Sequence, residues 1–115
     1  NKITLFRGEW LNDARVVVVS YGASARAARE AVLAARGKQH RKVGLLTLHT
    51  LWPFPEQLIE SVAAQARRIV VAEMNLGQLS LEVERIAGRR KVRRVLRADG
   101  ELLQPEEILA AIVGK

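Results

Sequence analysis

Four short runs of aliphatic and β-branched residues recur along the chain at nearly even spacing. Their starts are 27, 26 and 23 residues apart, and they cover Val16–Ser20, Val43–Thr47, Ile69–Glu73 and Val92–Leu96. This spacing leaves room for a helix and two loops each time, as a βαβ crossover requires. The first run is apolar at every position from Val16 to Val19, which is typical of a strand covered on both faces. We therefore predict a three-layer α/β/α fold with a mainly parallel sheet of about five strands.

The segments between these runs repeat their apolar residues at helical spacing. They predict four helices, over Ala23–Arg36, Pro55–Ala66, Gln78–Ala87 and Pro105–Val113. In the first helix, Ala28, Val32 and Ala35 form one apolar stripe, and Gly37 follows as a C-cap. In the second helix, Pro55 occupies the first helical position, where its missing N–H costs nothing.

The N-terminal part of the chain gives a weaker pattern. Ile3–Phe6 alternates between apolar and polar residues, so we expect an edge strand there, followed by a loop from Gly8 to Ala14. We find no internal repeat, linker or low-complexity segment, which predicts a single domain over residues 1–115. Because both ends are abrupt, we expect the chain to be a fragment of a longer polypeptide.

Composition excludes several classes of protein. With 49% hydrophobic residues, 115 residues are enough for one core. The absence of cysteine excludes disulfides, thiolate zinc sites, cysteine-ligated iron–sulfur clusters and a cysteine nucleophile. The longest aliphatic run, Val16–Val19, is far shorter than the ~20 residues that span a bilayer. No export or anchoring signal precedes it, so a cytoplasmic location is the default expectation.

The net charge of +7 permits an acidic partner. The densest basic run comprises Arg89, Arg90, Lys91, Arg93, Arg94 and Arg97. Because no aromatic residue is interleaved with these side chains, a solvated or interface arginine edge is a better interpretation than a nucleic-acid surface. Such an edge also protects a sheet from aggregation.

Three loops leave the predicted carboxyl ends of the strands, where ligands and partners of parallel α/β sheets gather. They are Tyr21–Ser24, Leu48–Pro55 and Glu73–Gln78. Their candidate site residues are Tyr21, Gly22, Ser24, His49, Trp52, Pro53, Phe54, Glu73, Asn75, Gly77 and Gln78.

The first loop has the composition of a strand-to-helix turn. Gly22 allows the tight turn and Ser24 is available as a helix cap, although backbone amides there also suit an anion. A dinucleotide fingerprint needs three spaced glycines and only Gly22 is present, and the P-loop pattern is absent. In the second loop, His49 lacks a paired ligand and is expected to be structural.

The second loop also concentrates the chain's large aromatic residues. Trp52 and Phe54 alternate with Pro53 and Pro55, and the prolines restrict the path of the backbone. The aromatic rings supply rigid contact area that suits either a cap on the domain's own core or an anchor on a partner. Both interpretations remain open from the sequence.

The third loop begins with an acid at the end of a buried run. Glu73 can cap a neighbouring helix, accept a hydrogen bond from an arginine, or act as a general base. Because no second carboxylate or nucleophile stands at an informative spacing, a structural or interface role is favoured over catalysis. Gly77 is expected to let the backbone turn into the helix that begins at Gln78.

Three stretches together resemble one family. Val16–Gly22, Leu51–Pro55 and Val70–Gln78, with the closing Pro105–Leu109, are similar to the alpha subunit of 2-oxoacid:ferredoxin oxidoreductases. The similarity falls in that subunit's C-terminal domain, which is itself similar to the transketolase C-terminal domain, and it covers nearly the whole chain. It implies one antiparallel strand, which would suit Ile3–Phe6.

The resemblance implies a complex that converts a 2-oxoacid and coenzyme A to acyl-coenzyme A and carbon dioxide while reducing ferredoxin. Thiamine diphosphate, Mg²⁺ and iron–sulfur clusters are expected elsewhere in that complex, with no cofactor, metal or catalytic residue in this domain. The domain would supply a scaffold that contacts other alpha-subunit domains and a beta subunit. The Glu-Met-Asn sequence at residues 73–75 is more similar to members acting on 2-oxoglutarate or branched-chain 2-oxoacids than to pyruvate enzymes.

Two other functions remain open. One is a small-molecule or anion site at the carboxyl edge of the sheet, formed by Gly22, Ser24, His49, Glu73, Asn75 and Gln78. The other is a nucleic-acid-binding module that uses Arg89–Arg97.

Overall fold

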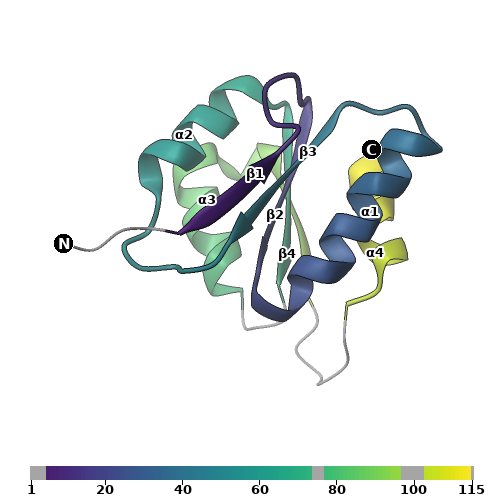
Figure 1. Ribbon diagram of the computed structural model, residues 1–115. Helices are drawn as coiled ribbons and strands as arrows, with labels where there is room; N and C mark the ends of the chain where they lie inside the picture. Colours follow the sequence, from purple (N-terminus) through teal and green to yellow (C-terminus); the bar gives the residue numbers. More distant parts are fainter. Residues whose placement is uncertain (1–4, 74–76, 97–102, 115) are drawn as a thin grey trace.

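A computed structural model describes residues 5–73, 77–96 and 103–114. It contains a five-stranded sheet with helices on both faces, which confirms the predicted three-layer fold (Figure 1). The strands are β1 (Phe6–Glu9), β2 (Val16–Tyr21), β3 (Val43–Leu48), β4 (Arg68–Glu73) and β5 (Val92–Leu96). The helices are α1 (Ala25–Gly37), α2 (Glu56–Gln65), α3 (Gln78–Ala87) and α4 (Pro105–Val113), with 3-10 turns η1 (Gly22–Ser24) and η2 (Arg89–Lys91).

The strand order is β1-β3-β2-β4-β5, and only the β1–β3 pair is antiparallel. Strand β2 is central because β3 pairs with one side of it and β4 with the other. The crossover after β2 leads to β3 on one side of it, and the crossover after β3 leads to β4 on the other side, so the topological switch point lies between β2 and β4. Open α/β sheets usually bind ligands at such a point.

Alternate residues of β2 supply two separate cores. Val16 and Val18 pack in the core that α1 and α4 cover, whereas Val17 and Val19 pack in the core that α2 and α3 cover. Figure 1 shows these two pairs of helices on opposite faces of the sheet. All four valines are buried, as expected for a strand between two helical layers. The side chains that cover them include Ala28, Ala31 and Val32 on α1 and Ile59, Val62 and Val83 on α2 and α3. Within the described residues, no helix combines the length and apolarity needed to cross a membrane.

Several predicted boundaries were wrong. The described edge strand is Phe6–Glu9, so Gly8 continues the strand and pairs with Leu46 instead of beginning a loop, because the antiparallel partner β3 satisfies its backbone. Ile3 and Thr4 of the predicted strand lie outside the described residues. Gly37 is the last residue of α1 and not its cap, and the left-handed turn comes later at His40, where φ is 53°.

Two helix starts also differ from the predictions. Helix α1 begins at Ala25, because Gly22–Ser24 form a 3-10 turn first. Helix α2 begins at Glu56, with Pro55 preceding it, and ends at Gln65. The predicted bounds of α3, α4 and β5 are confirmed.

Candidate functional site

The turn after β2 is closed by a hydrogen bond to the neighbouring strand. The Ser24 hydroxyl is completely buried and donates to the carbonyl oxygen of Ala72 at 2.7 Å. It also accepts the N–H of Tyr21 at 3.3 Å. Gly22 permits this turn because its φ is +66°. Ser24 occupies the predicted N-cap position of α1, but its side chain makes no cap bond to that helix, and the hydroxyl instead links the turn to β4.

Glu73 ends β4 and caps the N-terminus of α3. Its carboxylate is 2% exposed, and Oε1 accepts the Leu79 N–H at 3.1 Å. Oε2 accepts both the N–H of Ser80 at 2.7 Å and its hydroxyl at 2.6 Å. A carboxylate at this place satisfies helix amides and interacts favourably with the positive end of the helix dipole. Gly77 supplies the left-handed turn into α3, with a φ of +89°.

These bonds bear on the small-molecule alternative at the carboxyl edge. Both oxygens of Glu73 and the hydroxyl of Ser24 are used within the domain, beside the switch between β2 and β4. His49 lies on the loop after β3 and Gln78 begins α3, both are exposed, and Asn75 lies outside the described residues. Ser24 and Glu73 therefore hold the loops of this edge together, whereas the buried hydroxyl of Ser20 near the end of β2 has no hydrogen-bond partner among the described residues.

The aromatic loop between β3 and α2 divides its side chains between the core and the surface. Phe54 packs against the core beneath α2 and α3, together with Leu51 and Tyr21. Trp52 is 72% exposed, its ring centroid lies 6.4 Å from that of Phe54, and its peptide bond to Pro53 is cis. One aromatic ring thus anchors the loop and the other is presented to solvent.

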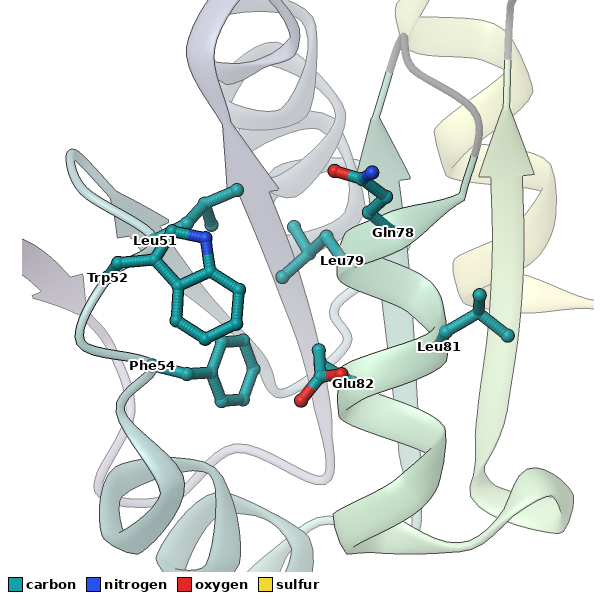
Figure 2. A pocket seen from close by; sticks show the side chains of 7 residues that line it. All are labelled: Leu51, Trp52, Phe54, Gln78, Leu79, Leu81 and Glu82. Carbon is teal, nitrogen blue, oxygen red and sulfur yellow. The ribbon is translucent and has the colours of Figure 1, made fainter.

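A groove of about 330 Å³ separates this loop from α3. Figure 2 shows Trp52 and Phe54 side by side on the loop, across from Leu79 and Glu82 on the helix. Leu81 also lines the groove and is 55% exposed. An apolar surface with an exposed tryptophan is typical of a contact site for another protein.

Ion pairs fix the helices beside the groove. Arg85 on α3 donates to Glu56 on α2 at 2.6 Å and to Glu82 at 2.9 Å. These hydrogen bonds raise the pKa of the Arg85 guanidinium, with the bond to Glu56 contributing most. The pairs are exposed, so their effect on stability is small, and the pair with Glu56 links α2 to α3.

Leu81, Glu82 and Arg85 were not among the predicted site residues. Leu81 had a usable signal, because it is apolar yet falls outside the inward stripe formed by Leu79 and Val83. The partnership between Glu56 and Arg85 joins residues 29 positions apart, and only the packing of α2 on α3 brings them together.

The residues also allow a test of the cofactors that the resemblance implies. Within residues 5–73, 77–96 and 103–114, no group of three histidine, aspartate or glutamate side chains gathers to hold a metal ion. The chain has no cysteine for an iron–sulfur cluster, and the buried Glu73 carboxylate is occupied by α3.

Comparisons with known proteins identify the family. Residues 14–108 match the family model of the pyruvate:ferredoxin oxidoreductase core domain II, so the chain belongs to that domain family. It is 41% identical over 115 residues to the 2-oxoglutarate synthase subunit KorA of Methanothermobacter marburgensis, covering 99% of this chain and 30% of the relative. It is 38% identical over 102 residues to the ketoisovalerate oxidoreductase subunit VorB of Methanothermobacter thermautotrophicus, covering 89% of this chain and 29% of the relative.

The chain thus spans about 30% of the length of these curated relatives.

Solved structures agree on the fold. The 2-oxoglutarate:ferredoxin oxidoreductase from Magnetococcus marinus superposes with a TM-score of 0.80 at 23% identity, covering 94% of this chain and 19% of that one. A split-gene transketolase superposes with a TM-score of 0.77 at 22% identity, covering 92% and 40%. The predicted likeness to both enzyme groups is confirmed at the level of the fold.

Proposed function

We propose that this chain is a non-catalytic scaffold and subunit-interface domain of a 2-oxoacid:ferredoxin oxidoreductase. The observation that carries the proposal is the 41% identity to a KorA subunit along 99% of the chain, combined with an exposed tryptophan beside an apolar groove. The complex would oxidise a 2-oxoacid by two electrons, release carbon dioxide and transfer the acyl group to the sulfur of coenzyme A. Ferredoxin would take up the electrons.

The interface role follows from the chemistry of the carboxyl edge. Two of the buried polar groups there, Ser24 and Glu73, are bonded within the domain, whereas Trp52 and Leu81 have large exposed areas. Burying exposed apolar area is the main driving force for association. We therefore assign the groove to contacts with another alpha-subunit domain or a beta subunit.

The reactive groups of the complex belong outside this domain. The absence of cysteine in the chain and its membership of the core domain II family support a complex in the cytoplasm whose other parts hold the thiamine diphosphate, Mg²⁺ and iron–sulfur clusters. Calorimetry tests this statement directly. We expect no binding of thiamine diphosphate to the chain alone, and tight binding would overturn the non-catalytic assignment.

The substrate class is supported by the named relatives, which are 2-oxoglutarate and ketoisovalerate enzymes. The test is to purify the polypeptide that carries this chain with its partner subunits and to follow ferredoxin reduction. We expect coenzyme A-dependent reduction with 2-oxoglutarate or a branched-chain 2-oxoacid, faster than with pyruvate. Absence of coenzyme A-dependent oxidation of any 2-oxoacid would contradict the proposed activity.

A further inference from the structure

A cluster of arginines lies at the edge of the sheet opposite the aromatic groove. Arg41 precedes β3, Arg67 and Arg68 lie at the start of β4, and Arg90 and Arg93 lie at the start of β5. Because the amino ends of parallel strands meet at one edge, these side chains converge there although they are far apart in the sequence. Together they line an open concavity of about 460 Å³ with Val113 and Gly114.

Part of this basic edge has a structural role. Arg68 donates to the carbonyl oxygens of Ala111 at 3.1 Å and Ile112 at 3.3 Å, and to that of Gly114. These carbonyls end α4, where a positive charge complements the helix dipole. Arg93 donates to the backbone oxygens of Arg90 and Val92. Arg68 and Arg93 are therefore held in place by the domain itself.

The remaining arginines lack acidic partners within the part of the chain that the structure describes. Arg41, Arg67 and Arg90 are exposed and form no ion pair with a described residue. The pKa of Arg68 is lowered by burial first and then by the nearby charges of Arg93, Arg67 and Arg41. Like charges are thus gathered at this edge without an acidic side chain to pair with Arg41, Arg67 or Arg90 among the described residues, an arrangement that favours an anionic partner.

The shape of the surface distinguishes among anionic partners. A second concavity shares Arg90 and Arg93 and continues along β5 past Arg89 and Arg94, where Glu84 on α3 also lines it and pairs with Arg94 at 2.8 Å. Strand β5 ends the sheet order, so one side of its backbone has no partner among the strands that the structure describes. An elongated, open surface beside a free strand edge fits an extended protein segment better than a small ion. No aromatic side chain lines either concavity, which disfavours stacking of single-stranded nucleic acid.

We propose that this arginine edge, defined by Arg41, Arg67, Arg68, Arg90 and Arg93, is a docking surface for an acidic segment of another protein chain. Guanidinium groups pair with carboxylates through two parallel hydrogen bonds, and Arg68 and Arg93 are already positioned by the backbone. A second copy of this chain is disfavoured because it would bring the same positive edge. The proposal does not depend on the aromatic groove or on the proposed enzyme activity.

The test is fluorescence anisotropy with a labelled peptide of alternating glutamate and threonine, titrated with the chain at low salt. Arg67→Glu and, separately, Arg41→Glu reverse one charge within the arginine edge. Arg26→Glu makes the same change in net charge in the first turn of α1, at the opposite edge of the sheet. Thermal melts followed by circular dichroism check that each variant folds. The use of two variants keeps the test decisive if one is unstable.

We expect the wild-type chain to bind the acidic peptide, and each variant of the arginine edge to bind about fivefold or more weakly. Arg26→Glu should bind within about twofold of wild type. Backbone amide signals of β5 in NMR spectra should shift on binding. Equal losses of affinity in all three variants would show that only the net charge of the chain matters, and would overturn the proposal. Tighter binding of pyrophosphate or duplex DNA, self-association through this edge, or no binding at all would also overturn it.

Discussion

The carboxylate of Glu73 and the side chain of Ser80 form a buried pair, in which Oε2 of Glu73 accepts the Ser80 hydroxyl at 2.6 Å and the Ser80 N–H at 2.7 Å. This contact joins the end of β4 to the first turn of α3 across the loop that contains Gly77. Since α3 also forms one wall of the aromatic groove, Glu73 positions that wall without facing the groove itself.

Loss of the Glu73 carboxylate should therefore destabilise the fold. We expect Glu73→Ala to lower the free energy of unfolding by about 3 kcal/mol, because it leaves the amides of Leu79 and Ser80 and the Ser80 hydroxyl without their acceptor. Glu73→Gln keeps one acceptor oxygen and should cost less. The control Glu60→Ala removes an exposed acid from α2 and should change stability by less than about 0.5 kcal/mol. Equal costs in urea unfolding would contradict the capping role.

Two glycines form a matched pair for a second prediction. A Cβ at Gly44 would lie 2.8 Å from the Trp10 carbonyl oxygen, so Gly44→Ala should cost about 2 kcal/mol through overpacking. Gly37 ends α1 with open space around it, and Gly37→Ala should stabilise by about 0.5–1 kcal/mol. Thermal or urea unfolding of both variants measures the difference. A tolerated alanine at residue 44 would show that the contact between β3 and the loop at Trp10 is not tight.

Low pH should weaken the ion pair between Glu84 on α3 and Arg94 on β5. Two hydrogen bonds from Arg94, at 2.8 and 2.9 Å, hold the pKa of Glu84 below its ordinary value of 4.5. Between the folded and unfolded pKa values the unfolded chain binds more protons, so stability falls as pH falls through this range. The contribution is complete above pH 4.5 and is lost at lower pH.

The variant Glu84→Gln isolates this effect. In urea unfolding at a series of pH values, the stability difference between wild type and Glu84→Gln should be largest near neutral pH. It should shrink below pH 4.5 as Glu84 becomes protonated in the wild type. A difference that stays constant down to pH 3 would contradict a role for the charged pair. Glu60→Gln serves as the control because Glu60 is exposed on α2.

Substitutions of exposed groove residues should weaken assembly of the complex without affecting the folding of the chain. Trp52→Ala and Leu81→Ser remove exposed apolar area, so each should leave the free energy of unfolding of the chain within about 0.5 kcal/mol of wild type. Within the parent complex, both should weaken subunit association by about tenfold or more, measured by analytical ultracentrifugation. Leu33→Ser on α1 is the matched control, with a leucine that is 44% exposed away from the groove. Equal effects of Leu33→Ser and Leu81→Ser would show that the groove has no special role.

The strands and helices could be predicted because their patterns are local. The unbroken valine run of β2 indicates burial on both faces, and Gly88 correctly ends α3, with a φ of +91°. The placement of β1 could not be predicted as well, because an edge strand depends on pairing with β3, which is remote in sequence. The loop from Gly8 onward looked irregular because neither burial nor periodicity marks a half-exposed edge.

The site was only partly predictable for a similar reason. The sequence identified Glu73 and the aromatic loop as unusual, but it left open whether Glu73 capped a helix or acted on a ligand. That choice depends on the position of Ser80 in space. Similarly, it could not decide which aromatic ring faces the core, because Trp52 and Phe54 have the same hydrophobic character and only the course of the loop separates them. The arginine edge required the strand order, which places Arg41 and Arg67 together.

Exposure of Trp52 in the assembled complex tests the interface assignment most directly. The chain has two tryptophans, so replacing Trp10 by phenylalanine leaves Trp52 as the single tryptophan that reports on the groove. Incorporating 5-fluorotryptophan into this polypeptide alone then distinguishes the Trp52 signal from those of tryptophans in partner subunits by ¹⁹F NMR. We expect the resonance to be strongly affected by a soluble paramagnetic agent in the free chain and protected from that agent once the partner subunits are added. A resonance equally accessible before and after assembly of an active complex would contradict the assignment of this groove to subunit contacts.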